Sequence, residues 1–214
     1  MKNQKKGLQN KKIYLVIDPQ MKQETIIEKL KIVIKKDIAA VQIWDSFKEG
    51  QDVSRLISEI HAICRPENIP LFINNRWEYL ISLGIDGVHF DAIPEDIDSI
   101  RNKVGREFII GITCGNDIKV VEWAAENKVD YISFCSMFPS SSAGECEIID
   151  HEIIIKARDI FKNTLYLSGG IYPNNIKELQ SIDFDGIAVI SGVMSSENPS
   201  EAIDEYRNEI NEIK

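Results

Sequence analysis

The chain has 214 residues, of which 43% are hydrophobic and 28% are charged, and its formal net charge is −9. This composition suits one domain with a substantial core, and the acidic balance argues against nucleic acid or an anionic membrane surface as a standing partner. The four cysteines show no CxxC or zinc-ligand spacing, and no apolar stretch approaches the roughly 20 residues that cross a bilayer, which favours a reducing, cytoplasmic location.

The first twelve residues are basic and lack the apolar stretch of a secretory signal. We interpret residues 1–12 as a basic N-terminal arm that precedes a single domain over residues 13–214. The domain begins with the first of eight short apolar runs, which are rich in Ile, Val, Tyr and Phe.

These runs alternate with longer segments of helical spacing, such as residues 24–36. Each run is too short for a buried helix and is typical of a strand that is covered on both faces. The eight runs are 13–17, 39–44, 70–74, 86–90, 108–113, 130–134, 165–169 and 185–190. Strict alternation of strands and helices predicts parallel pairing through right-handed crossovers.

Two fold classes accommodate this alternation, a closed (β/α)8 barrel and a doubly wound open sheet. Three runs share a feature, an aspartate just before the strand that follows an apolar residue: Asp86, Asp130 and Asp185. A repeated unit suits a closed architecture, eight units match the strand number of the barrel, and no GxGxxG follows the first run. We therefore predict a single (β/α)8 TIM barrel.

In such a barrel the functional residues lie in the loops after the strands, and the loops after strands seven and eight commonly bind phosphate. Gly169 and Gly170 follow the seventh run, where the absence of a Cβ permits positive φ and close approach of a ligand to backbone N–H groups. Ser191 after the eighth run adds a hydroxyl. The alternative is a tight turn followed by an asparagine helix cap, Asn174 or Asn175.

The longest loop follows the sixth run and contains three consecutive serines. Because alternate residues of an extended loop point the same way, Ser140 and Ser142 could bind one ligand together. The alternative is a solvated, serine-rich loop without a ligand.

Seven motifs, in this order and spacing, resemble the thiamine phosphate synthase and thiazole tautomerase superfamily from Ile13 to about Tyr206. They are VQIW, FINNR, LGIDGVHF, GIT, MFPSSS, LSGGI and DGIAVISGVM. The resemblance implies a (β/α)8 barrel and a transferase of thiamine biosynthesis, which joins hydroxymethylpyrimidine pyrophosphate to thiazole phosphate and releases pyrophosphate with Mg²⁺. The implied partner is a small phosphorylated heterocycle. The oligomeric state stays open, with a homodimer as one arrangement.

The resemblance divides the implied site into two halves. On the thiazole-phosphate side, the chain matches the family's hydroxyl segment, its Gly-Gly turn and the backbone of its last loop. The matching residues are Ser140, Ser142, Gly169, Gly170, Ile190 and Ser191. The implied catalytic positions are Gln42, Asn74, Asn75 and Thr113.

The pyrophosphate side departs from the family. Trp44 and Ser46 stand where the family has the arginine and lysine that hold pyrophosphate, and Ala143 replaces a third cation. Asn75 replaces a magnesium carboxylate, and a neutral amide is a poorer ligand for a hard cation. Removing one stabilising group of this kind typically slows an enzyme by about 100 to 1000-fold, so these losses predict weak catalysis unless other groups compensate.

Three further residues are candidates for that compensation. Lys48 and Arg76 could supply cations, and Asp91 could supply a magnesium ligand. Arg76 could equally be a solvated helix cap or a surface ion pair. Trp44 could stack on a heteroaromatic ring or pack beneath a loop.

Two alternatives to a working synthase stay open. A binding or regulatory protein would hold the phosphorylated heterocycle without ionising a pyrophosphate. A tautomerase would need a proton-transfer residue, for which the family uses a histidine where this chain has Gly115. The adjacent Cys114 is the substitute considered, although cysteines at strand ends are usually buried and inert, and we interpret His89 as structural.

Overall fold

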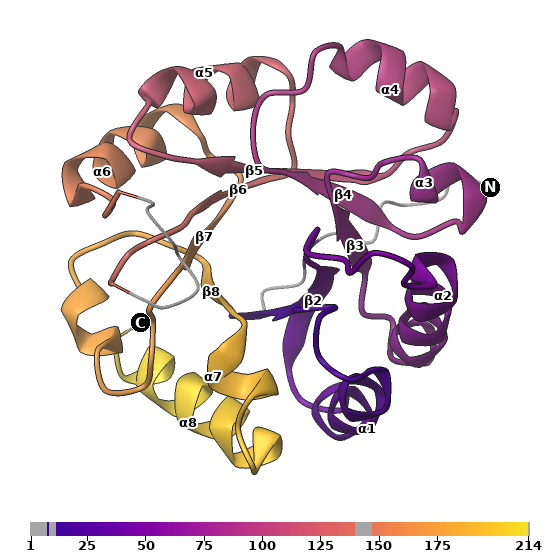
Figure 1. The fold of residues 1–214 in the computed structure, drawn as a ribbon. Helices are drawn as coiled ribbons and strands as arrows, with labels where there is room; N and C mark the ends of the chain where they lie inside the picture. The colour runs from indigo at the N-terminus through magenta and orange to yellow at the C-terminus, as the bar shows by residue number, and fades with distance from the viewer. Residues whose placement is uncertain (1–7, 9–11, 140–146, 214) are drawn as a thin grey trace.

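The computed structural model describes residue 8 and residues 12–139 and 147–213. Eight parallel strands close into a barrel, in which each strand pairs with the next along the chain and the last pairs with the first. The helices surround the strands on the outside (Figure 1). The predicted (β/α)8 barrel is confirmed.

The observed elements match the predicted runs to within a residue or two. The strands are β1 (Ile13–Ile17), β2 (Ile38–Ile43), β3 (Leu71–Asn74), β4 (Gly87–Phe90), β5 (Ile109–Cys114), β6 (Tyr131–Phe134), β7 (Thr164–Ser168) and β8 (Gly186–Val189). The α-helices are α1 (Gln23–Val33), α2 (Val53–Cys64), α3 (Tyr79–Ser82), α4 (Ile97–Val104), α5 (Ile118–Glu126), α6 (His151–Ile160), α7 (Ser191–Met194) and α8 (Pro199–Glu212). The 3-10 helices are η1 (Arg65–Glu67) and η2 (Ile176–Leu179).

The strands are apolar on both faces because each face contacts a different core. On β1, for example, Ile13 and Leu15 pack in the layer between barrel and helices, while Tyr14 points into the barrel interior. The interior cluster is built around four aromatic rings, Tyr14, Phe72, Tyr131 and Tyr166, with centroid separations between 5.2 and 5.9 Å. This cluster fills the lower barrel and forms the floor beneath the loops.

The repeated aspartates have a structural role that explains their position. The carboxylate of Asp86 accepts a hydrogen bond from the amide of Leu71 at 3.0 Å, at the start of the preceding strand. Asp130 does the same for Ile110 at 2.8 Å, and Asp185 for Leu165 at 2.8 Å. Each aspartate therefore pairs a backbone donor where two neighbouring strands begin, which favours the parallel register.

The strand-then-helix alternation is weakest after β7. The predicted helix there is only the 3-10 helix η2, because the preceding loop from Gly169 to Asn175 uses much of the connection to β8. Aspartate side chains cap the start of α2, α4, α5 and α6, as Asp96 does for α4 by accepting from the amide of Ser99 at 2.8 Å.

The predicted boundary after residue 12 is described only in part. The carbonyl of Lys12 accepts a hydrogen bond from the amide of Ile187 at 2.8 Å, and Leu8 packs against the interior cluster. Residues 1–7 and 9–11 of the predicted arm lie outside the described residues. No helix in the described ranges has both the length and the apolar character needed to cross a membrane.

Candidate functional site

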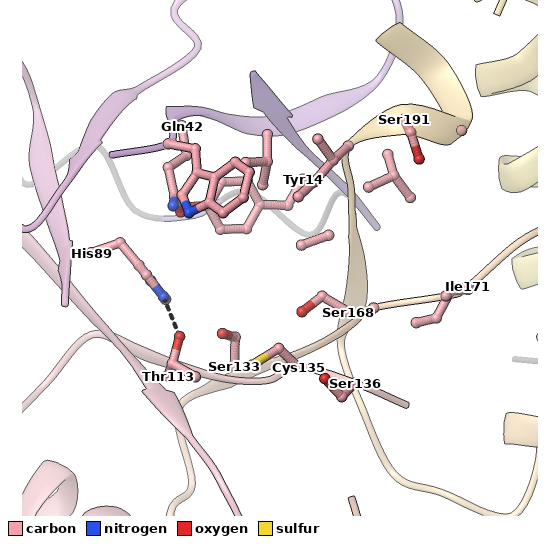
Figure 2. Close-up of a pocket in the computed structure, with 18 of the residues that line it drawn as sticks. Tyr14, Gln42, His89, Thr113, Ser133, Cys135, Ser136, Ser168, Ile171 and Ser191 are labelled. Atoms are coloured by element: carbon pink, nitrogen blue, oxygen red, sulfur yellow. Dashed lines mark hydrogen bonds between the residues drawn. The ribbon is translucent and has the colours of Figure 1, made fainter. Parts of the chain in front are cut away.

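A cavity of about 380 Å³ opens at the carboxyl ends of the strands. Every strand contributes at least one lining residue from its inward-facing set, and β1 contributes both Tyr14 and Val16. The others are Gln42, Asn74, His89, Thr113, Ser133, Ser168 and Ala188. Figure 2 shows several of these side chains converging from opposite sides of the barrel. The cavity thus lies where the fold predicts function, above the aromatic floor.

A hydrogen-bonded chain of five side chains crosses the barrel at the base of this cavity, and all of them except Tyr131 line it. The Tyr14 hydroxyl donates to Gln42 Oε1 at 2.6 Å and lies 2.7 Å from the Tyr131 hydroxyl. The Tyr131 hydroxyl lies 2.9 Å from His89 Nδ1, and His89 Nε2 lies 2.8 Å from Thr113 Oγ1 (Figure 2). Gln42 and Thr113 end the chain, and both line the cavity.

The direction of this chain follows from counting protons. Since Tyr14 gives its single proton to Gln42, Tyr131 must donate to Tyr14, and Tyr131 then accepts from the Nδ1–H of His89. His89 Nε2 therefore accepts from the Thr113 hydroxyl. In this direction the Gln42 amide can donate to a ligand, while the Thr113 oxygen can accept from one.

His89 is neutral at physiological pH. Burial lowers the pKa of its imidazole from 6.5 to about 4, and the nearby Asp91 carboxylate opposes that shift only in part. A neutral imidazole is what the hydrogen-bonded chain requires, because one ring nitrogen donates and the other accepts. His89 therefore has the structural role predicted for it and is also part of the cavity wall.

Asp91 is clamped by the two asparagines that follow each other at the end of β3. Asn74 Nδ2 donates to Asp91 Oδ1 at 3.0 Å, and Asn75 Nδ2 donates to Asp91 Oδ2 at 2.9 Å. The Asp91 amide donates back to Asn75 Oδ1 at 3.0 Å. Asn75 adopts a left-handed φ of 58°, a conformation that asparagine tolerates better than most residues. The structure thus brings three predicted site residues together.

Asp91 is the one carboxylate among the described residues that line the cavity. Both Asp91 carboxylate oxygens already accept amide hydrogens, and Asn75 Oδ1 is occupied by a backbone amide. Among the described residues, no group of three or more His, Cys, Asp or Glu side chains is placed to hold a metal ion. Mg²⁺ is commonly bound through one or two carboxylates together with substrate phosphates and waters, so Asp91 would supply a single protein ligand beside a bound diphosphate.

The two candidate cations are engaged with protein groups outside the cavity wall. Arg76 Nε donates to Asp45 Oδ1 at 2.6 Å, and its guanidinium lies 4.7 Å from the centroid of the Phe47 ring. Lys48 Nζ donates to the carbonyl of Gln20 at 2.8 Å. Neither side chain is among the described residues that line the cavity. Both cations tie neighbouring loops together.

The Gly169–Gly170 turn lies on the other side of the cavity. Both glycines have positive φ, 85° and 67°, and no described residue accepts a hydrogen bond from either backbone amide. A Cβ on Gly169 would lie 2.3 Å from Ser136 N, and one on Gly170 would lie 2.5 Å from Phe138 O. The missing Cβ atoms thus make room for the loop after β6, whereas the sequence predicted room for a ligand.

Two side chains hold this turn in place. Asn175 Nδ2 donates to the carbonyl of Gly170 at 2.8 Å, while Asn175 Oδ1 accepts from the amide of Tyr172 at 2.9 Å. The Tyr206 hydroxyl on α8 donates to the carbonyl of Ile171 at 2.9 Å. Asn175 therefore stabilises the turn itself, in addition to standing at the start of η2.

Ile190 and Ser191 join the turn from the next loop, since both line the cavity at the start of α7. Figure 2 places Ser191 on the same side of the cavity as Ser168 and Ile171. Ser140 and Ser142, the predicted hydroxyl pair, lie outside the described residues.

Cys114, the proton-transfer residue considered for a tautomerase, is not suited to that role. Its side chain is fully buried, it is absent from the described lining of the cavity, and burial raises its pKa to about 12. Because it is buried away from the cavity, this thiol does not contact a ligand there, and with a pKa of about 12 it does not ionise near neutral pH.

Comparison with known proteins agrees with the fold. A family model described as thiamine monophosphate synthase matches residues 13–193, which is most of the chain. The chain belongs to the thiamine monophosphate synthase family. The thiamine-phosphate synthase of Methanobrevibacter smithii is 26% identical over 190 residues, which cover 87% of this chain and 89% of the relative. That of Clostridium tetani is 26% identical over 201 residues, with 94% and 96% covered.

Solved structures show the same fold. Thiamine phosphate pyrophosphorylase from Pyrococcus furiosus superposes with a TM-score of 0.78 at 23% identity, over 95% of this chain and 97% of that one. A 3-hexulose-6-phosphate synthase from Salmonella typhimurium gives a TM-score of 0.71 at 15% identity, over 95% and 100%.

In this member of the thiamine monophosphate synthase family, Tyr14, Tyr131 and Ser133 reach the site without being predicted there. Tyr131 and Ser133 lie two residues apart on β6, and their side chains face the same interior. The signal that could have found them is this period of two within runs that are otherwise uniformly apolar.

Proposed function

We propose that this protein acts in thiamine biosynthesis as a thiamine phosphate synthase-like transferase whose cavity binds a phosphorylated thiazole. Membership of the thiamine monophosphate synthase family is the observation that carries the proposal. The Gly169–Gly170 turn supports it, because these two residues, whose amides have no described acceptor, line the same cavity as Ser191. We assign the phosphate to this turn and to the Ile190–Ser191 backbone, with Ser140 and Ser142 as further hydroxyls.

The transfer would form a bond between the thiazole nitrogen and the pyrimidine methylene carbon, while pyrophosphate leaves with the electrons of the broken carbon–oxygen bond. In this chain, Gln42 and Thr113 would orient the rings by hydrogen bonds of opposite character. Asn74 and Asn75 would act through Asp91, which they hold in place. Any requirement for Mg²⁺ belongs to this proposal, as do cations from Lys48 and Arg76, which would have to leave their present partners.

A turnover assay tests the transfer. Folded, purified protein is incubated with hydroxymethylpyrimidine pyrophosphate and thiazole phosphate, with and without Mg²⁺, and thiamine phosphate is measured. The absence of product would contradict the transferase assignment.

The phosphate assignment is tested separately by calorimetry with thiazole phosphate. Gly170→Ala should weaken binding at least tenfold, because the new Cβ would meet Phe138 O at 2.5 Å and displace the turn. Gly84→Ala is the matched control, since Gly84 also has positive φ, 64°, but a Cβ there meets nothing within 4 Å. Equal affinity in the two variants would place the phosphate elsewhere.

A second candidate function is binding without transfer. The observation that favours it is the engagement of Arg76 with Asp45 and of Lys48 with Gln20, which leaves the described cavity lining without a cation for pyrophosphate. It predicts calorimetric binding of thiazole phosphate with no Mg²⁺-dependent binding of pyrophosphate. Strong Mg²⁺-dependent pyrophosphate binding would exclude it.

A further inference from the structure

We propose that Trp44 and Asp91 form a recognition site for a positively charged heteroaromatic ring carried by a phosphorylated ligand. The proposal rests on the proposed function, because it takes the ligand's phosphate to lie at the Gly169–Gly170 turn. It adds the electrical character of the ring, which neither the family match nor the sequence assigns.

Trp44 supplies an aromatic surface at the cavity wall. It follows β2 directly, its amide donates to the carbonyl of Ile17 at 2.9 Å, and its half-buried side chain packs against the interior cluster. This anchoring leaves the indole among the residues that line the cavity. The cation–π contacts within the described ranges use other rings, those of Phe47 and Trp77. The Trp44 ring therefore has no protein cation over it in that part of the chain.

Asp91 supplies the charge. Among the described residues that line the cavity, Asp91 is the only Asp, Glu, Lys or Arg. Amide donors from Asn74 and Asn75 hold one carboxylate oxygen each, so the group is fixed in position. Each oxygen keeps a further lone pair for a ligand.

The loops after β2, β3 and β4 bring these two residues to one side of the cavity. The amide of Asp45, next to Trp44, donates to Asn74 Oδ1 at 3.4 Å, and Asn74 in turn donates to Asp91. Arg76 and Lys48, which could reverse the local potential, pair with Asp45 and Gln20. The net result is an aromatic face and one carboxylate with no lining cation.

Such a surface discriminates between ligands by charge. A cation over an indole face gains electrostatic attraction from the ring quadrupole, and the fixed carboxylate of the exposed Asp91 adds a solvent-screened attraction. A diphosphate would instead meet a carboxylate of the same sign. Among heteroaromatic phosphates, the site should therefore prefer a ring that is alkylated at nitrogen, such as a thiazolium, over its neutral thiazole parent.

The test compares two ligands that differ by one methyl group and one charge. They are 4-methyl-5-(2-phosphooxyethyl)thiazole and its N-methylthiazolium derivative, and both dissociation constants are measured by calorimetry on the full chain. The thiazolium should bind about tenfold more tightly, a difference of ~1.4 kcal/mol. The preference should shrink as the KCl concentration rises, because salt screens the carboxylate.

Variants separate the two contributions. Trp44→Leu should reduce the preference to about threefold or less, while Trp44→Phe should keep part of it because a phenyl ring retains the quadrupole. Asp91→Asn should reduce the preference and remove most of its salt dependence. Trp44→Arg should reverse the selectivity and raise the affinity for inorganic pyrophosphate. Folding of each variant is checked by its thermal midpoint, and inorganic phosphate serves as a ring-free reference ligand.

The outcomes distinguish this proposal from the one on which it rests. If neither phosphate ester binds the natural chain, both proposals fail. If both bind with equal affinity, or if the preference survives Trp44→Leu unchanged, the ring site fails while the phosphate assignment stands. A preference for the neutral thiazole would also overturn it.

Discussion

Replacing Tyr131 with phenylalanine tests the hydrogen-bonded chain that crosses the barrel. The change deletes one hydroxyl and leaves the ring, so packing of the aromatic floor is nearly conserved. His89 Nδ1 loses its partner at 2.9 Å, and the Tyr14 hydroxyl loses one of its two partners. A buried polar group left without a partner costs about 1–3 kcal/mol, and one lost hydrogen bond costs about 1 kcal/mol.

The two contributions give a loss of about 2–4 kcal/mol in the free energy of unfolding. For a domain of this size, that corresponds to a fall of about 4–16 °C in the thermal midpoint. Tyr166→Phe is the matched control, because its ring lies 5.2 Å from that of Tyr14 while its hydroxyl bonds to no described residue. We expect Tyr166→Phe to lower the free energy of unfolding by less than about 1 kcal/mol.

Urea titrations followed by circular dichroism measure both variants, and nitrogen NMR of labelled histidine reports the tautomer of His89. In Tyr131→Phe, His89 should carry its proton on Nε2, because Thr113 is then the only side chain still hydrogen-bonded to the imidazole among the members of the hydrogen-bonded chain. Equal unfolding free energies for Tyr131→Phe and Tyr166→Phe, together with an unchanged tautomer, would refute the reasoning.

Three further predictions concern the same framework. The pKa of His89 is about 4 in the folded protein and 6.5 in the unfolded chain. Its contribution to the free energy of unfolding, at most about 3 kcal/mol, is therefore complete above pH 6.5 and is lost as pH falls towards 4. Urea midpoints of the natural chain should fall over this window more steeply than those of His89→Asn. Asp130→Ala should lower the free energy of unfolding by about 1–3 kcal/mol, because it leaves the buried amide of Ile110 on β5 unpaired. Asp98 has a side chain that is 79% exposed, so Asp98→Ala should change the urea midpoint little. Tyr206→Phe should weaken thiazole phosphate binding by about three- to tenfold in calorimetry, since the loop after β7 loses its support from α8; unchanged affinity would show that this support is not needed.

Much of the fold could be read along the chain because its signals are local. Short apolar runs, the helical segments between them and the aspartates at positions 86, 130 and 185 act over a few residues or between neighbouring strands. The position of Gly169 and Gly170 after the seventh run was equally local, and the structure confirms that they form a turn with positive φ. Their role in phosphate binding stays a prediction.

The site itself depended on contacts between distant residues. Tyr14 and Tyr131 are 117 positions apart, and only closure of the barrel brings their hydroxyls to 2.7 Å. The partners of Arg76 and Lys48 were also invisible in the sequence, because an arginine or lysine carries no mark of whether it will face a ligand or a neighbouring loop.

The sequence by itself therefore determined the (β/α)8 barrel, which follows from the periodicity and order of its apolar runs, and it indicated the family through the resemblance of its motifs. Tertiary structure decided the polarity of the site. It turned alternate strand residues inward, joined Gln42 to Thr113 through three buried side chains, and drew both candidate cations away from the cavity. The physical reason is that hydrogen bonds and ion pairs form between atoms within about 3 Å of each other, and in a closed barrel those atoms come from strands that are far apart in the chain.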